Sequence, residues 1–349
     1  MQAKKRFWGI VGLCVGLMVG FMSSRNSQAA VSGPQNNIGF SVSASLPSNQ
    51  LDQKNSYFDL KLESGQKQTL KATVSNLTNR DIKVKTSIHT AYTNHNGAVE
   101  YITPTKQFDS SLKYQLAQLT QIKGDKLITV PANGSKIVEA VAHIPETAFQ
   151  GVMLGGWNFE KVEEKVTSNV KGAMNVRNQY AYMIAMKYTL GKVPAPRLVL
   201  SKVEPGLENG RQSIFPYIRN VTATIVPGLI LDTKISNRET GKVIKTVQKS
   251  GVKLAPNSVF KYPILTGKEQ LKAGKYHLRM IAKNKDHRWV FEKDFEITAA
   301  AAKKYNQASI ENKQLKPIWL VAFGAFGMLV LGSLIIWLIL FVKKRKSHL

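Results

Sequence analysis

The sequence holds few side chains whose type and spacing could perform chemistry. Its only cysteine, Cys14, lies in an apolar stretch near the N-terminus, so the rest of the chain has no thiol nucleophile and no thiolate metal ligand. His89 and His95 flank an expected hairpin tip, a spacing that suits solvated side chains better than metal ligands. No GxSxG, HExxH, P-loop, GxGxxG or EF-hand pattern occurs. We expect no enzyme activity, no metal and no cofactor.

One group of carboxylates invites a glycosidase interpretation. Glu160, Glu163 and Glu164 lie close together, but a glycosidase needs a desolvated acid facing a second carboxylate across a cleft. These residues sit in a polar, lysine-rich stretch, so a charged linker is the better interpretation. His143 and His277 fall opposite the apolar parity of their strands, and we expect both to face solvent.

The chain is strongly basic, with 49 Lys and Arg against 22 Asp and Glu and a formal net charge of +27. The two ends hold eight of these positive charges, which leaves about +19 on the segment between them. Such a field favours anionic partners such as the phosphate-rich polymers of a bacterial wall, although it can also serve solubility alone. We do not expect nucleic-acid binding, because the lysines alternate along strands and do not gather with aromatic residues.

The first 29 residues predict a signal peptide, with an uncleaved N-terminal anchor as the alternative. Lys4, Lys5 and Arg6 precede an uncharged apolar run over 7–22, and Ser27-Gln-Ala29 supplies the small residues of a cleavage site. An exported chain without cysteine suits a bacterial surface, where folding rests on the core alone.

A second apolar run, 318–342, carries no charge and is long enough to span a bilayer with some tilt. The basic tail 343–349 follows it, without the LPxTG motif of a sortase substrate. We therefore expect a single-pass membrane protein whose ectodomain faces the wall and whose C-terminus is cytoplasmic.

Between the ends the dominant hydrophobic period is two, which is typical of half-buried strands. Leu70, Ala72 and Val74, for example, alternate with polar neighbours. Short strands with turn signals between them predict an all-β chain of two immunoglobulin-like β-sandwich domains in tandem. We place the first domain at 30–160. Within it we expect a short helix at Ser110–Leu119 and a glycine-rich final strand.

The final strand of the first domain, Gly151–Phe159, holds three glycines, which predict a bulge or a close backbone approach. Residues 161–178 are polar and aperiodic and read as a linker, or as a hairpin. We expect the second domain at 179–299, opening with the strand Tyr180–Tyr188, and a helical stalk at 300–317. Its other expected strands are Arg197–Val203, Ser213–Val226, Leu229–Ser236, Lys242–Lys249, Val259–Ile264, Tyr276–Ala282 and Arg288–Thr298.

Several local strings resemble the WxL-interacting proteins of Gram-positive bacteria, in order and spacing along nearly the whole mature chain. In the first domain they are 38–50 (IGFSVSASLPSNQ), 57–61 (YFDLK), 65–70 (GQKQTL) and 151–156 (GVMLGG), and in the second they are 203–211 (VEPGLENGR), 255–260 (APNSVF) and 271–278 (LKAGKYHL).

The resemblance implies a first domain that binds peptidoglycan and a second that binds WxL-domain surface proteins. Together they would form a non-enzymatic scaffold that tethers an adhesin complex between membrane and wall. Two alternatives stay open: a wall hydrolase, and a membrane-anchored assembly factor for exported surface proteins. Because exposed arginine and tyrosine often anchor interfaces, Arg211, Tyr217 and Arg219 are our candidates for partner contact. The competing interpretation places Tyr217 in the core and both arginines in solvent.

Overall fold

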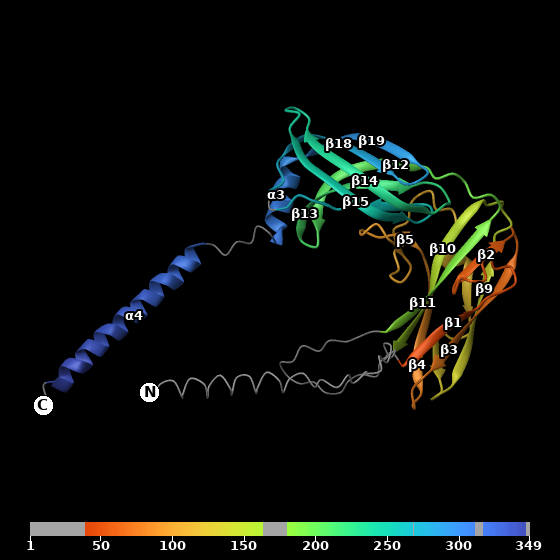
Figure 1. Cartoon of the computed structure of the whole chain (residues 1–349), viewed down its shortest axis with the longest axis horizontal. Coiled ribbons are helices and arrows are strands. Elements are labelled where there is room, and N and C mark those ends of the chain that lie inside the picture. Colours follow the sequence, from red (N-terminus) through yellow and green to blue (C-terminus); the bar gives the residue numbers. More distant parts are fainter. Residues whose placement is uncertain (1–38, 163–179, 268, 311–316, 347–349) are drawn as a thin grey trace, which may run out of the picture. The chain divides into compact units, whose positions relative to one another are not determined.

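The computed structural model describes residues 39–162, 180–267, 269–310 and 317–346 (Figure 1). The expected signal peptide at 1–29 and most of the expected linker at 161–178 lie outside the described residues. The described chain is mostly β-strand, arranged in two β-sandwich domains, and the fold class expected from the sequence is confirmed.

Two facing sheets form the first domain. One has the strand order β1-β3-β9-β7 and the other the order β2-β11-β10-β4-β8. They pack through aromatic residues: the rings of Phe40 on β1 and Tyr182 on β11 lie 5.0 Å apart, edge to face. The strands are β1 (Phe40–Ser45), β2 (Phe58–Leu62), β3 (Lys67–Asn76), β4 (Ile82–Thr90), β7 (Thr120–Lys123), β8 (Leu127–Val130), β9 (Ser135–His143), β10 (Gly151–Val162) and β11 (Ala181–Leu190).

Strand β10 lies inside its sheet, and every residue from Gly151 to Phe159 is buried. Trp157 points into the core, where its indole nitrogen donates to the hydroxyl of Thr86 at 2.7 Å. A Cβ on Gly155 would come within 2.6 Å of the backbone oxygen of His89. The expected close backbone approach at these glycines is therefore confirmed.

The expected start of the second domain is wrong for one strand. We expected Tyr180–Tyr188 to open the second domain, but β11 pairs with β10 antiparallel and with β2 parallel, inside the first domain. Alternation shows that one face of a strand is buried but not against which sheet.

The second domain also has two sheets. One has the order β12-β13-β16, with β17 also paired with β13, and the other has the order β15-β14-β18-β19. One hydrophobic core between them draws residues from both sheets, including Ile214, Leu231, Phe260 and Leu278. The strands are β12 (Leu198–Glu208), β13 (Arg211–Asn220), β14 (Val226–Asn237), β15 (Val243–Leu254), β16 (Ser258–Lys261), β17 (Ile264–Leu265), β18 (Gly274–Lys283) and β19 (Arg288–Ile297). Each of the seven strands expected from Arg197 onward has a counterpart here.

The first part of the expected stalk, 300–317, is a helix docked on the second domain, and residues 311–316 lie outside the described residues. Helix α3 (Ala299–Ala308) buries Ala302 in the second core, and Tyr305 packs against that core. The side chain of Asn306 accepts from the backbone N–H of Leu271 and donates to its oxygen, both at 2.9 Å. The composition of α3 is mostly polar, but one apolar stripe and the side-chain amide of Asn306 are enough to dock it on the domain.

Residues 91–119, between β4 and β7, form an insertion of the first domain. It contains β5 (Tyr92–Thr93), β6 (Val99–Glu100) and α2 (Leu116–Leu119). The helix expected over Ser110–Leu119 is confined to its last turn. Asp109 accepts from both the backbone N–H and the hydroxyl of Ser111, and such local bonds compete with helix formation.

The last element is α4 (Pro317–Lys346), which covers the apolar run 318–342. Within the described residues it is the one helix long and apolar enough to cross a membrane, over Phe323–Leu340. Its apolar side chains in that stretch are exposed.

Candidate functional site

The three residues expected to contact a partner share one face of β13. Arg211, Tyr217 and Arg219 have the same parity along the strand, opposite to the core residues Ile214 and Ile218. The structure therefore brings them onto the outer surface of one sheet. Their local surroundings differ.

Arg219 binds the insertion of the first domain. Its Nε lies 2.6 Å from Asp109 Oδ2 and its Nη2 lies 2.8 Å from Asp109 Oδ1, a bidentate pair. The same Nη2 donates to the hydroxyl of Ser110 at 2.8 Å. This arginine is thus an internal contact between the two domains.

Tyr217 is half-buried in a small cluster of charges. Its hydroxyl donates to Glu204 at 2.5 Å, and the ammonium of Lys202 lies 4.4 Å from its ring centroid. Burial, reinforced by the bond to the Glu204 carboxylate, raises the pKa of Tyr217. Arg211 is exposed at the start of the strand, opposite Glu208 in the pairing with β12.

Further contacts join the insertion to the second domain. The hydroxyl of Thr93 lies 2.6 Å from that of Ser258 and accepts from the backbone N–H of Ala255 at 2.9 Å. All three groups are buried, so each bond replaces water that the interface has removed. Beside them, the backbone N–H of Lys253 donates to the oxygen of Gly97 at 2.7 Å.

His95 belongs to the same interface. We expected it in solvent at a hairpin tip, but its Nδ1 lies 3.0 Å from Glu208 Oε2 on β12 of the second domain. His89 is also engaged, its Nδ1 lying 2.5 Å from the backbone oxygen of Ile102. The turn prediction was right, and His95 stays exposed as expected, with 49% of its side chain accessible beside Glu208. His89 is half-buried, which the sequence did not show. His277, expected in solvent, lies 2.7 Å from Asp294 Oδ1 across strands. In the described part of the chain, no cluster of three metal-ligating side chains occurs.

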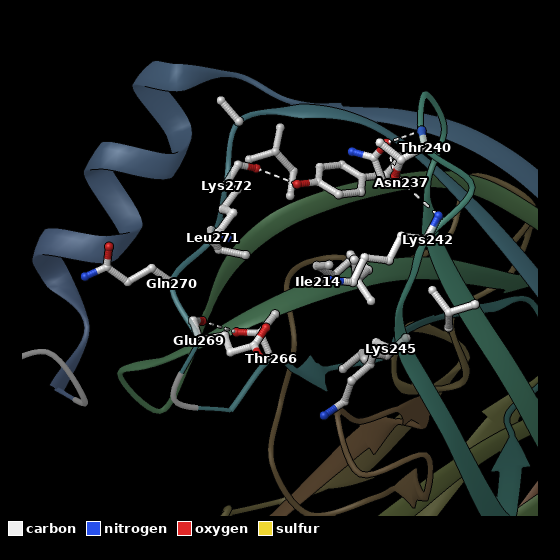
Figure 2. A pocket seen from close by; sticks show the side chains of 16 residues that line it. Ile214, Asn237, Thr240, Lys242, Lys245, Thr266, Glu269, Gln270, Leu271 and Lys272 are labelled. Carbon is white, nitrogen blue, oxygen red and sulfur yellow. Dashed lines mark hydrogen bonds between the residues drawn. The ribbon is translucent and has the colours of Figure 1, made fainter.

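A groove of about 370 Å³ opens beside β15 in the second domain (Figure 2). Its floor consists of core residues, among them Ile214, Ile264 and Tyr276. Lys242 and Lys245 stand on the β15 side. The lining residues are Ile214, Asn237, Thr240, Lys242, Val243, Ile244, Lys245, Ile264, Thr266, Glu269, Gln270, Leu271, Lys272, Ala273, Tyr276 and Ile297.

Sequence reasoning missed this groove. Its residues come from β13, the end of β14 and the turn after it, β15, β17, the loop before β18, β18 itself and the end of β19. No single segment therefore carries its pattern. The one local signal is Val243-Ile244, two consecutive apolar residues at the start of a strand rich in lysine. Their side chains are 43% and 40% exposed, where alternation alone would bury one of them.

Comparison with known proteins gives family matches for both domains. Residues 40–161 match the model of the WxL Interacting Protein, peptidoglycan binding domain, and residues 171–307 match that of the WxL Interacting Protein, host binding domain. Both descriptions are of binding domains and neither describes an enzyme. No curated protein matches the chain.

Solved structures that resemble the chain include pilus-type chaperones. The YadV chaperone is 10% identical with a TM-score of 0.27, over 74% of this chain and 100% of that one. The chaperone DraB of E. coli is 15% identical with a TM-score of 0.28, over 74% and 98%. CupB2 of Pseudomonas aeruginosa is 13% identical with a TM-score of 0.25, over 69% and 97%.

Likenesses this weak say nothing about what the present chain binds. The family matches, in contrast, cover most of the described residues before α4, in the order that the sequence predicted. The chain belongs to the WxL Interacting Protein family.

Proposed function

We propose that this protein is a non-enzymatic scaffold that binds peptidoglycan through its first domain and a WxL-domain surface protein through its second. The helix α4 would anchor it in the membrane, with the ectodomain outside and the basic tail in the cytoplasm. The proposal extends the family descriptions of the two domains to a tethering role between membrane and wall.

The observation that carries the proposal is the docking of the first domain's insertion onto the second domain. A bidentate ion pair, a buried hydroxyl pair and a backbone hydrogen bond connect the two domains. Domains joined only by a linker move independently, whereas such an interface holds two binding surfaces in one body. This suits a protein that holds two partners at a fixed separation.

The short connection between the second domain and α4 supports an order of the two domains outward from the membrane. Helix α3 is docked on that domain, and only residues 309–316 separate it from α4. Eight residues span at most about 28 Å when extended. In the proposed scaffold the second domain therefore lies close to the membrane and the first domain faces the wall.

The segment between the two basic ends, which carries about +19 of the chain's net charge of +27, also agrees with a location in a wall rich in anionic polymer. Charge alone would attract any acidic surface, so specific binding to peptidoglycan must survive salt. At about 0.5 M salt the screening length falls below 5 Å, and attraction between exposed charges weakens strongly.

The test uses the full chain in nanodiscs of neutral lipid. It is mixed with purified peptidoglycan stripped of anionic polymers, and separately with a purified WxL-domain protein, at low and high salt. The proposal expects both to be retained at high salt. Loss of both at high salt would leave only a basic membrane anchor and overturn the proposal.

One observation favours the second candidate, an assembly factor for exported proteins: β15 is a sheet edge with an exposed groove beside it. An assembly factor would release its partner once that partner is folded. A scaffold holds the mature form. Binding of unfolded but not of folded WxL-domain protein would therefore favour the assembly factor.

A further inference from the structure

We propose that the groove beside β15 binds an extended acidic segment of the protein partner, which adds as a strand to the edge of β15 and inserts an apolar side chain. This inference rests on the proposed function, because it names the segment by which the second domain would hold its partner.

The edge of β15 is open where the groove lies. Strand β15 pairs with β14 along its length and is the outer strand of its sheet. Near its end, the first domain's insertion covers it, since Lys253 donates to Gly97. From Val243 to Lys249, β14 is its only strand partner among the described residues. An outer strand offers its free backbone N–H and C=O groups to an extended peptide.

The groove offers an apolar pocket next to that edge. Ile214, Ile264 and Ile297 are each 1% exposed and line it, so its floor is the domain's own core. Figure 2 shows Leu271 on the wall opposite Lys242, in the loop before β18. A volume of about 370 Å³ accepts one or two large side chains. Strand addition commonly combines backbone pairing with pockets for alternate side chains.

Charge decides the chemistry of the occupant. Lys242, Lys245 and Lys272 line the groove, and Glu269 is its one acidic residue. Within the part of the chain that the structure describes, none of these three lysines forms an ion pair. A strand bearing carboxylates would find three cations there, and a basic strand would be repelled.

The competing explanation is that these lysines only protect the edge from pairing. Lysine at an edge and a bulge are known devices for this purpose, and the register with β14 shifts beside Ile244. Protection, however, needs no hollow lined with core residues beside the strand. The same lysines that repel a basic strand and must lose water to cover a neutral one attract an acidic strand.

The test measures binding of a labelled octapeptide in which glutamate alternates with leucine, by fluorescence anisotropy, to the full chain in neutral-lipid nanodiscs. Empty nanodiscs serve as the blank. Comparison peptides carry lysine in place of glutamate, or N-methyl groups on either alternate set of residues. We expect the acidic peptide to bind at least about tenfold more tightly than the basic one. We also expect one of the two N-methylated peptides to lose binding, because strand addition uses one edge of the peptide.

The matched variants are the double change Lys242→Glu and Lys245→Glu and, as control, Lys285→Glu in the exposed turn between β18 and β19. The double variant should weaken binding of the acidic peptide by about tenfold and the control by less than about twofold. All variants should keep the thermal midpoint of the unchanged chain, which separates lost binding from lost folding.

Equal binding of acidic and basic peptides, or equal effects of the double variant and the control, would overturn the groove as the site. The same variants then separate this inference from the proposed function. If the double variant still captures a WxL-domain protein, the groove is not its site although the scaffold stands. If the unchanged chain captures none, the proposed function fails.

Discussion

Arg219 and Asp109 form a bidentate ion pair between the two domains, with N–O distances of 2.6 and 2.8 Å. The Asp109 side chain is 2% exposed and that of Arg219 is 28% exposed. Burial alone would raise the pKa of Asp109, but the hydrogen bonds from Arg219 and Ser111 outweigh it and lower this pKa below its usual value. The pair therefore stabilises the contact between the insertion and the second domain.

Removing the arginine should loosen this contact. Arg219→Ala leaves a buried carboxylate without its cation, and we expect a loss of about 2 kcal/mol in the free energy of unfolding. Adding Asp109→Asn should recover part of the loss, because the buried charge is then gone. Urea unfolding and hydrogen exchange of residues 91–119 measure both effects. As control, Arg197→Ala, at an exposed position, should change stability by less than about 0.5 kcal/mol. Additive effects of the two changes would contradict the pairing.

The ion pair should also make the free energy of unfolding depend on pH. A carboxyl whose folded pKa is lowered contributes its full stability above its unfolded pKa, near 4, and loses it as the pH falls through the folded pKa. The difference in unfolding free energy between the unchanged chain and Asp109→Asn should therefore be largest above about pH 5 and shrink below about pH 4. Urea titrations at several pH values measure it. The other carboxylates titrate alike in the unchanged chain and in Asp109→Asn. If the difference in unfolding free energy stayed constant with pH, the lowered pKa would not belong to Asp109.

Gly151 should be the glycine that tolerates substitution least at the domain contact. It has a φ of +125°, and a Cβ there would lie 2.4 Å from the backbone oxygen of Ala223. We expect Gly151→Ala to cost about 3 kcal/mol or more, since neither backbone can yield easily. Gly228 provides the control, because its φ is +64° and nothing lies within 4 Å. Gly228→Ala should cost about 1 kcal/mol from backbone strain alone. Equal urea midpoints for the two variants would show that the close approach to Ala223 is unimportant.

Asn306 should hold α3 on the second domain. Asn306→Ala leaves the backbone N–H and C=O of Leu271 without their partner, and we expect a loss of about 2 kcal/mol. Because Leu271 lines the groove, the change should also weaken binding of the acidic peptide. Gln307→Ala, next to it and exposed, is the control and should do neither. Protection of α3 in hydrogen exchange reports the docking directly, and unchanged protection in Asn306→Ala would contradict this role.

The sequence was sufficient to predict the strands and their faces. Tyr276, Leu278, Met280 and Ala282 share one parity, and the structure buries all four on one face of β18. Hydrophobic period is a local property of the chain, and so is the long apolar run of α4. The order of family strings was likewise readable from sequence alone, since it requires no contact between distant residues.

The tertiary structure decided which sheet each strand joined and which polar side chains were engaged. The pairing of β11 with β2 depends on residues more than a hundred positions apart. The position of Arg219 on an outer face was predictable, but the Asp109 that binds it lies 110 residues away. The groove beside β15 gathers residues from strands and loops spread along the second domain, from Ile214 to Ile297. Alternation fixes only which face of a strand is apolar. What covers the polar face, and where two sheets leave a gap, follows from packing between segments whose separation along the chain carries no local signal.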